Sequence, residues 1–338
     1  MPYDRLARKL AGRETAALTT LPDGSVDYFC TVAENGDRRI ESRDAFARAV
    51  LDERDSLRFR VDTVEPGGQA VNAAMQLHAL GDPVTCYGHL DAPAFESLPF
   101  ETVSMGEPSE VYVLTFDDRD LMLARNTDLA EWTLADLDGE ADLSTVFAAD
   151  GICCSNWVSS PGLERAFHRL GRLDVPRVPF VFDPGDVVGH DAEAVEALHE
   201  AMSALQDTFD VVYNANRAEV EATAAPLSGT YDDDLDRLAA VREETGIAAA
   251  VMHARDEAAA ATPDGRVRVA NYRVDAPERH TGGGDRFTGG LAHALACGWD
   301  WDVALAMGNA CAVTYVESGT TGDVDDLVEF VHTHASET

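Results

Sequence analysis

The sequence predicts an α/β fold, with a central, mostly parallel sheet flanked by helices and a small β-rich lid. Three observations support this fold class. Apolar runs alternate with helical patterns through the second half of the chain, two glycine-rich segments each lead into a helical pattern, and the first half contains a hairpin pattern. No internal repeat or low-complexity linker divides the 338 residues, so we expect one main domain.

The second half, from residue 149 onward, gives the clearest pattern. Strand-like apolar runs are separated by helical stretches, and this repetition is typical of a parallel sheet covered on both faces. The runs are residues 151–154, 178–182, 210–213 and 247–253, and the helical stretches are residues 161–170, 192–205 and 232–244.

The first half is organised differently. Residues 3–19 predict an amphipathic helix, so we expect residues 1–24 to be an N-terminal helical extension of a domain spanning residues 25–338. The first strand is expected at 26–32. Apolar and arginine residues alternate over 57–61, which favours a strand with one wet face. Residues 110–116 and 121–125 resemble a hairpin, and the lid strands are expected at about 36–64 and 107–126.

The charge balance excludes one class of partner. The chain has 61 acidic and 26 basic residues, a net charge of -35, and Lys9 is its one lysine. Scattered acids of this kind are typical of proteins in molar salt, where the Debye length is about 3 Å. An ordinary acidic cytosolic protein is the alternative. Either way we expect no nucleic acid partner, because phosphate backbones require a basic surface.

The cysteines and the apolar segments indicate a compartment. Six cysteines show neither a CxxC pair nor metal-ligand spacing, which indicates reduced thiols. The first 21 residues carry charges throughout, unlike a signal peptide, and no window approaches 18 apolar residues. We therefore expect a cytoplasmic protein with no membrane partner.

The strongest motif is Thr281-Gly282-Gly283-Gly284-Asp285, which runs into a helical pattern ended by Gly298. Glycines before a helix let free backbone N–H groups approach an anion. A carboxylate there would repel a phosphate, but it would serve as a general base if it faced an attacking hydroxyl. The alternative is a glycine turn in which Asp285 is only the helix N-cap.

A second glycine motif lies near the start of the chain. Gly67 and Gly68 open a helical pattern that Gly81 ends, and Asn72 falls in its first turn, where an amide can reach a bound hydroxyl. A plain helix entry is the alternative.

These two motifs, in this order, resemble the paired signatures of the ribokinase-like (PfkB) carbohydrate kinase family over residues 25–330. Further positions agree with the resemblance: Asn216 and Glu219 match the N-x-x-E element, and Asp183-Pro184, Asn309 and Asp37 fall at family positions.

The resemblance implies a role for each position. Asp285 would be the catalytic base and Gly282, Gly283 and Gly284 would form the anion hole. Substrate would contact Asp37, Gly67, Gly68 and Asn72; the nucleotide would contact Asn216, Glu219, Thr281 and Asn309, with Glu219 reaching Mg²⁺ indirectly. ATP and Mg²⁺ are the implied cofactors, with K⁺ as an optional ion. The lid would exclude water and is a candidate homodimer contact.

The chain departs from the family pattern at three places. Arg279 and His280 replace the usual Asp-Thr pair, which affects the monovalent-cation site. Residues 251–256 replace the usual Thr-x-Gly-x-x-Gly turn, and residues 38–56 form a long insertion on the substrate side.

The acceptor class is left open by the residues. Arg38 and Arg125 would suit a phosphate, which slightly favours a phosphosugar of the ribose-1-phosphate type, unless these arginines merely balance nearby acids. A free sugar or a nucleoside is the alternative acceptor. A noncatalytic sugar-binding sensor is a different class, whereas a dinucleotide oxidoreductase would carry its glycines after the first strand.

Overall fold

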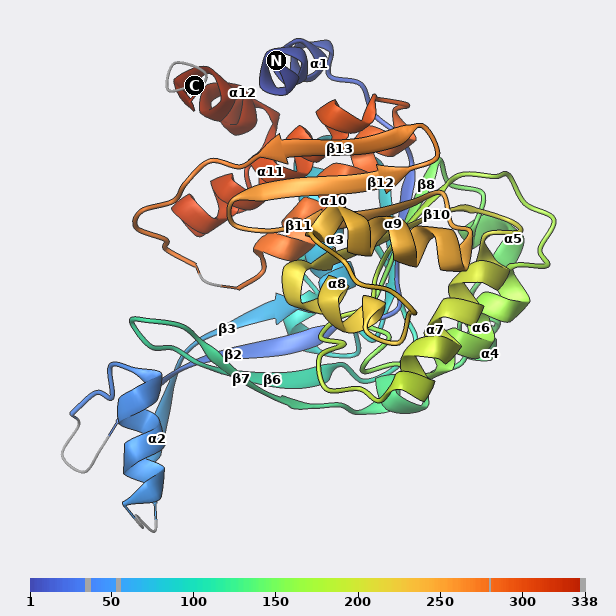
Figure 1. The fold of residues 1–338 in the computed structure, drawn as a ribbon. Helices are drawn as coiled ribbons and strands as arrows, with labels where there is room; N and C mark the ends of the chain where they lie inside the picture. The colour runs from blue at the N-terminus through green and yellow to red at the C-terminus, as the bar shows by residue number, and fades with distance from the viewer. Residues whose placement is uncertain (34–37, 53–55, 280, 335–338) are drawn as a thin grey trace.

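A computed structural model describes the chain except for residues 34–37, 53–55, 280 and 335–338 (Figure 1). Its main body is built on a nine-stranded sheet with the order β13-β12-β11-β10-β9-β8-β1-β4-β5. All neighbours from β5 to β11 are parallel, and only β12 and β13 are antiparallel additions at one edge. The strands are β1 Leu18–Leu21, β4 Val84–Gly88, β5 Glu101–Ser104, β8 Gly151–Ser155, β9 Pro179–Asp183, β10 Asp210–Asn216, β11 Ala249–His253, β12 Glu257–Thr262 and β13 Gly265–Ala270.

Helices cover both faces of this sheet, and each face has its own apolar core (Figure 1). One layer contains α1 Pro2–Gly12, α3 Gln69–Ala79, α10 Gly283–Ala296, α11 Trp301–Ser318 and α12 Val324–His334. The other contains α4 Leu134–Glu140, α5 Leu143–Val146, α6 Gly162–Leu170, α7 Ala192–Leu205, α8 Arg217–Ala224 and α9 Asp234–Thr245. Short 3₁₀ turns lie at η1 Pro93–Phe95 and η2 Asp128–Glu131. The predicted fold class is confirmed.

The central strands form where apolar residues run without alternation. Every residue of β8 is buried, as the sequence Gly-Ile-Cys-Cys-Ser permits, because helices lie on both of its faces. Among the described residues, no helix is both long and apolar enough to cross a bilayer.

The N-terminal prediction is wrong in one respect. The helix α1 ends at Gly12, and Leu18–Leu21 forms β1, which pairs with β4 and β8 inside the sheet. Residues 1–24 are therefore not only a helical extension. The error has a physical cause: β1 is four residues long and buried on both faces, so it lacks the alternation that distinguishes a strand from helical patterns.

A second sheet of four strands, in the order β3-β2-β6-β7, extends away from the main body, with α2 Arg43–Leu51 at its tip (Figure 1). We call this sheet the lid. It contains β2 Ser25–Ala33, β3 Arg58–Gly67, β6 Ser109–Leu114 and β7 Leu121–Arg125. The predicted hairpin of β6 and β7 is confirmed, whereas β2 lies outside the ranges expected for the lid.

The sequence predicted that β3 would have one solvent-exposed face and one buried face, but its apolar side chains are not buried. Phe59 and Val61 remain 55% and 41% exposed, so the described chain leaves the apolar side of this strand largely uncovered. Alternation alone predicts a strand correctly but does not show what packs on it.

Candidate active site

The two glycine motifs meet at one point of the molecule. Asn72 lies in the first turn of α3, and its Nδ2 donates a hydrogen bond of 2.7 Å to Oδ2 of Asp285, which lies 213 residues further along the chain. Gly68, the N-cap of α3, has a φ of 99°, and a Cβ there would lie 2.8 Å from the Cα of Gly24. Glycine at this position therefore permits the turn that directs α3 toward α10.

Asp285 is the third residue of α10, whose N-cap is Gly282. The N-cap alternative for Asp285 is therefore wrong, and its carboxylate is available for other contacts. Burial raises the pKa of Asp285 to about 6; the charge of Arg286 and the Asn72 hydrogen bond oppose that shift, while the charge of Asp23 adds to it. A carboxyl group with this pKa is mostly ionised at pH 7 and can accept a proton.

The start of α10 is closely packed from several sides. A Cβ on Gly284 would lie 2.9 Å from Nε2 of His253, and one on Gly283 would lie 3.0 Å from Cγ2 of Val316. The N–H groups of a helix's first turn have no acceptor within the helix, and together with the helix dipole they favour an anion. The residues 282–284 therefore form a nest of amides immediately before the Asp285 carboxylate.

Asp27 is a candidate substrate ligand that sequence reasoning missed. It lies at the start of β2, accepts a 2.6 Å hydrogen bond from Oγ of Ser25, and lies so close to Gly67 that a Cβ there would be 2.2 Å from its Oδ2. Burial raises the pKa of Asp27 to about 6, and the neighbouring charge of Asp285 contributes to this shift. Asp27 and Asp285 therefore lie near each other.

Asp37, the residue predicted for this role, lies outside the described residues. Asp27 could have been found from its position shortly after β1, the first strand of the central sheet. Because the sequence does not distinguish β1 from a helix, β2 is the first strand that it predicts, and the aspartate that follows β2 is Asp37.

Two further buried aspartates support the site. Asp23 is 2% exposed and accepts hydrogen bonds from the backbone N–H groups of Gln69 and Ala70, at 2.9 and 2.7 Å, so it fixes the start of α3. Asp183 ends β9 and accepts from Nε2 of Gln69 at 2.9 Å and from the N–H of Gly185 at 3.0 Å. Burial and the charge of Asp285 raise the pKa of Asp183.

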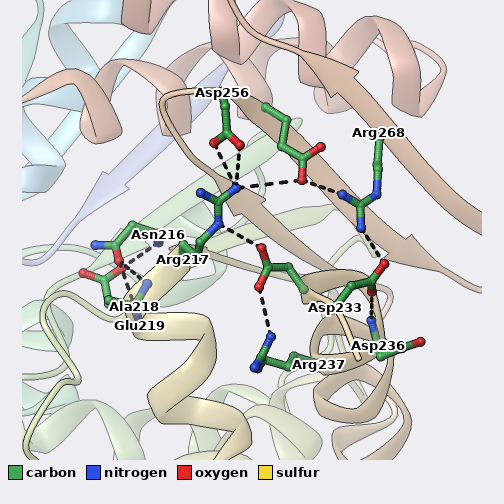
Figure 2. Close-up of polar contacts among 11 residues, drawn as sticks. Asn216, Arg217, Ala218, Glu219, Asp233, Asp236, Arg237, Asp256 and Arg268 are labelled. Atoms are coloured by element: carbon green, nitrogen blue, oxygen red, sulfur yellow. Dashed lines mark hydrogen bonds and ion pairs between the residues drawn. The ribbon is translucent and has the colours of Figure 1, made fainter. Parts of the chain in front are cut away.

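The predicted N-x-x-E element caps α8, as Figure 2 shows. Oδ1 of Asn216 accepts from the N–H groups of Ala218 and Glu219, and Oε2 of Glu219 accepts from the N–H of Asn216 at 2.8 Å. Burial, followed by the charge of Asp183, raises the pKa of Glu219. Beside this cap, Arg217 pairs with Asp234 and Asp256, which joins α8 to α9 and to the turn after β11.

The other predicted site residues have different surroundings. Asn309 is 1% exposed, and its Nδ2 donates to the hydroxyl of Tyr3 and the carbonyl of Val269, so it belongs to the core rather than to an open nucleotide surface. Thr281 is partly buried just before the amide nest. Arg38 is exposed, and the exposed Arg125 lies 3.5 Å from Glu110.

Arg279, one of the positions that depart from the family pattern, contacts the lid. Its Nη2 donates to both carboxylate oxygens of Glu65, at 2.9 and 3.0 Å, and its guanidinium lies over the ring of Phe29 at 4.4 Å. Glu65 is on β3 and Phe29 on β2, so this arginine joins the segment before the amide nest to two lid strands.

Comparison with known proteins now identifies the family. The family model for prokaryotic ketohexokinase matches residues 35–334. The chain belongs to the prokaryotic ketohexokinase family. It is therefore a carbohydrate kinase that uses a hydroxyl group as acceptor, and the resemblance to ribokinase-like kinases is confirmed. Ketohexokinase from Haloferax volcanii is 29% identical to it over 335 residues, covering 91% of this chain and 88% of that protein.

Solved structures agree on the fold of this ketohexokinase family member. Ribokinase from Thermotoga maritima has a TM-score of 0.66 at 15% identity and covers 94% of this chain and 98% of its own. The nucleoside kinase of Methanocaldococcus jannaschii has a TM-score of 0.65 at 15% identity, with coverage of 94% and 98%. Arabidopsis thaliana ribokinase, solved with ribose and ATP, has a TM-score of 0.66 at 15% identity, with coverage of 94% and 99%.

Proposed function

We propose that this kinase transfers the terminal phosphoryl group of ATP to a hydroxyl of a ketohexose, with Asp285 as the general base. The observation that carries the proposal is the 2.7 Å hydrogen bond between Asn72 and Asp285. Asp285 has a raised pKa and directly follows the glycines 282–284, and its partner Asn72 lies on the helix that Gly67 and Gly68 precede, which supports a base between the two glycine motifs.

The reaction follows from this arrangement. The carboxylate of Asp285 accepts the proton of the sugar hydroxyl as its oxygen attacks the terminal phosphorus of ATP. The new O–P bond forms, the bond to the leaving oxygen breaks, and ADP departs with that electron pair. Meanwhile the N–H groups of 282–284 stabilise the charge on the transferred phosphoryl group.

An uncharged ketohexose suits the site better than a phosphosugar. Asn72 donates to the proposed base, and Asp27 lies against Gly67 within reach of the charge of that base; a carboxylate and an amide can both hydrogen-bond hydroxyl groups. The phosphosugar hypothesis depends on Arg38 and Arg125, which are exposed, and Arg125 faces Glu110. The ketohexokinase family model and the one relative reported with that name support the same choice.

The nucleotide would bring Mg²⁺ with it. Among the described residues, no group of three or more carboxylate, imidazole or thiol side chains is arranged to hold a metal. Burial, and after it the charge of a neighbouring carboxylate, raises the pKa values of Asp183 and Glu219. Two buried acids close to further acids would suit an ion held mainly by phosphates and water. Asp183 and Glu219 would hold that hydrated ion, and Mg²⁺ would neutralise charge on the phosphates.

We also propose that the kinase is cytoplasmic, works at high salt and forms a homodimer through the lid. A cytoplasmic location is supported by six free cysteines and by the need for ATP, and work at high salt is supported by the net charge of -35. A homodimer through the lid is supported by apolar side chains exposed on β3 and β7: Phe59, Val61, Val64, Met122 and Leu123.

The test is an assay of ADP release in high KCl with fructose, ribose, fructose 1-phosphate and a nucleoside as acceptors. We expect ADP release to depend on fructose and to fall by about a thousandfold or more in Asp285→Asn, because the base is lost. Asp62→Asn, an acidic lid residue paired with Arg60, is the control and should retain activity. Fructose binding without turnover would instead support the sensor hypothesis, and a preference for the phosphosugar would reverse the choice of acceptor.

A further inference from the structure

Arg286, the residue after the proposed base, is a buried cation with incomplete contacts. Its side chain is 3% exposed, and its Nη1 is buried without a hydrogen-bond partner. Its Nε donates to Oγ1 of Thr321 at 3.0 Å, and its guanidinium lies over the ring of Tyr315 at 4.2 Å. Within the described chain it forms no ion pair with a carboxylate.

Such a residue is unfavourable for folding alone. Removing a guanidinium from water without pairing it costs more free energy than a cation–π contact returns. Burial lowers the pKa of Arg286, yet a guanidinium stays protonated in proteins. A packed apolar side chain would suit this interior better, so the buried charge requires a functional explanation.

The position of the guanidinium supplies that explanation. The guanidinium and Gly282 both lie against the ring of Tyr315: the guanidinium is 4.2 Å from the ring centroid, and a Cβ on Gly282 would lie 3.1 Å from Cε1. The backbone N–H groups of Glu278 and Arg279 both donate to the carbonyl of Val316, which fixes the segment before the nest against α11. The cation therefore shares an aromatic contact with the first residue of the amide nest, and it follows Asp285 directly in α10.

The charges that surround Asp285 make a cation useful there. The groups that face this carboxylate from other elements are acids or neutral, because burial lowers the pKa of His253 to about 4 and Asn72 is uncharged. The nearby cation Arg279 is already paired with Glu65 on β3. The acids are Asp23 after β1, Asp27 on β2 and Asp183 on β9. A phosphoryl group brings further negative charge to the same place.

We propose that Arg286 is a positioning residue that acts as a built-in cation. Its fixed charge adds to the dipole of α10, so the amide nest favours the terminal phosphoryl group of ATP and the ionised form of Asp285, and Arg286 touches neither. This inference rests on the proposed function. It also predicts that the kinase does not need K⁺ at this loop, because the guanidinium already supplies the positive charge.

The test compares Arg286→Gln and Arg286→Lys with Thr321→Val, which removes the hydrogen bond to Nε and keeps the charge. Titration calorimetry would measure the affinities for ADP and for a nonhydrolysable ATP analogue. We expect Arg286→Gln to lose about tenfold more affinity for the analogue than for ADP, because only the analogue carries the terminal group. The rising limb of its pH profile of kcat should also move to higher pH. Both affinities and the pH profile of the Arg286→Lys and Thr321→Val variants should stay close to those of the wild type.

Equal losses for both nucleotides, with an unchanged pH profile, would overturn the inference, as would a wild-type requirement for K⁺ over Na⁺ at constant ionic strength. Circular dichroism would verify that each variant folds. If Arg286→Gln does not fold, the ion replacement in wild type and the Lys variant decide the matter. If the wild type turns over fructose and Arg286→Gln has wild-type affinities and pH profile, this inference alone is rejected. If the wild type binds neither nucleotide, the inference and the proposed function are both rejected.

Discussion

At the scale of single residues, the pKa of Asp285, raised to about 6, sets a pH dependence for the reaction. The base must be ionised to accept a proton, so kcat should rise as the pH increases through about 6 and level off above it. A pH profile of kcat from 4.5 to 8.5 at saturating fructose and ATP would measure this. Because the pKa of Asp27 is also about 6, the profile of Asp27→Asn serves as the control: it should keep one rising limb, at a slightly lower pH because a negative charge near Asp285 is removed. A rate that rises toward acid would contradict the role of Asp285.

Asp27 gives a second prediction at this scale. Asp27→Asn keeps the size and one oxygen acceptor but removes the charge that strengthens hydrogen bonds from sugar hydroxyls. We expect the KM for fructose to rise by about 10–100-fold, equivalent to about 1.4–2.7 kcal/mol, and the KM for ATP to change by less than about threefold. Steady-state kinetics with each substrate varied in turn would show this. Equal changes in both KM values would remove Asp27 from the sugar site.

The sequence placed Asp285 and Asn72 in one candidate site, and the structure brings these two side chains together. Glycines mark the local backbone turns that position them. Asn309 could not be judged in this way, since its contacts with Tyr3 and Val269 join segments from opposite ends of the chain. Burial of a polar side chain depends on tertiary packing, which a local motif does not encode.

At the scale of secondary-structure elements, predictability depended on the length of the pattern. The bounds of α7 match the predicted 192–205 because Asp191 caps a long amphipathic stretch, with its side chain accepting from the N–H of Ala194. The short strand β1 had no comparable signal. Because β1 was not predicted, sequence reasoning assigned the substrate role to Asp37, which lies outside the described residues, and did not consider Asp27.

The contact of Arg279 with the lid gives a prediction for these elements. Arg279→Ala removes the ion pair with Glu65 and the contact with Phe29, so the lid strands lose their link to the segment before the amide nest. We expect the KM for fructose to rise about fivefold and the ratio of ATP hydrolysis to sugar phosphorylation to increase, because a loosened lid admits water. Parallel assays of ADP and of sugar phosphate would measure both.

Arg60→Ala is the matched control for this prediction. Arg60 lies on the same strand as Glu65 and pairs with Asp62, but its side chain is 78% exposed, so its loss should leave the coupling of the reaction unchanged. If the Arg60 and Arg279 variants behaved alike, the change in KM and in ATP hydrolysis would come from general lid stability rather than from the link to the segment before the amide nest.

At the scale of the whole molecule, we expect the net charge of -35 to affect stability more than any single ion pair does. Many of the ion pairs are exposed, and exposed pairs typically contribute about 0–1 kcal/mol each. Repulsion among unpaired acids acts across the surface at low salt, where the Debye length is about 10 Å at 0.1 M, and largely disappears near 1 M, where it is about 3 Å.

The free energy of unfolding should therefore increase by several kcal/mol between 0.1 M and 2 M KCl. Urea unfolding followed by circular dichroism at each salt concentration would measure the increase. Sorbitol at matched osmolality is the control. It stabilises folded proteins because it is excluded from their surface, but it does not screen charge. If sorbitol stabilised the protein as strongly as KCl, or if KCl had no effect, screening of charge repulsion would not explain the stability of this protein in salt. A stabilisation specific to KCl would mean that the acidic surface makes folding depend on salt, and that every activity assay of this kinase needs salt in the molar range.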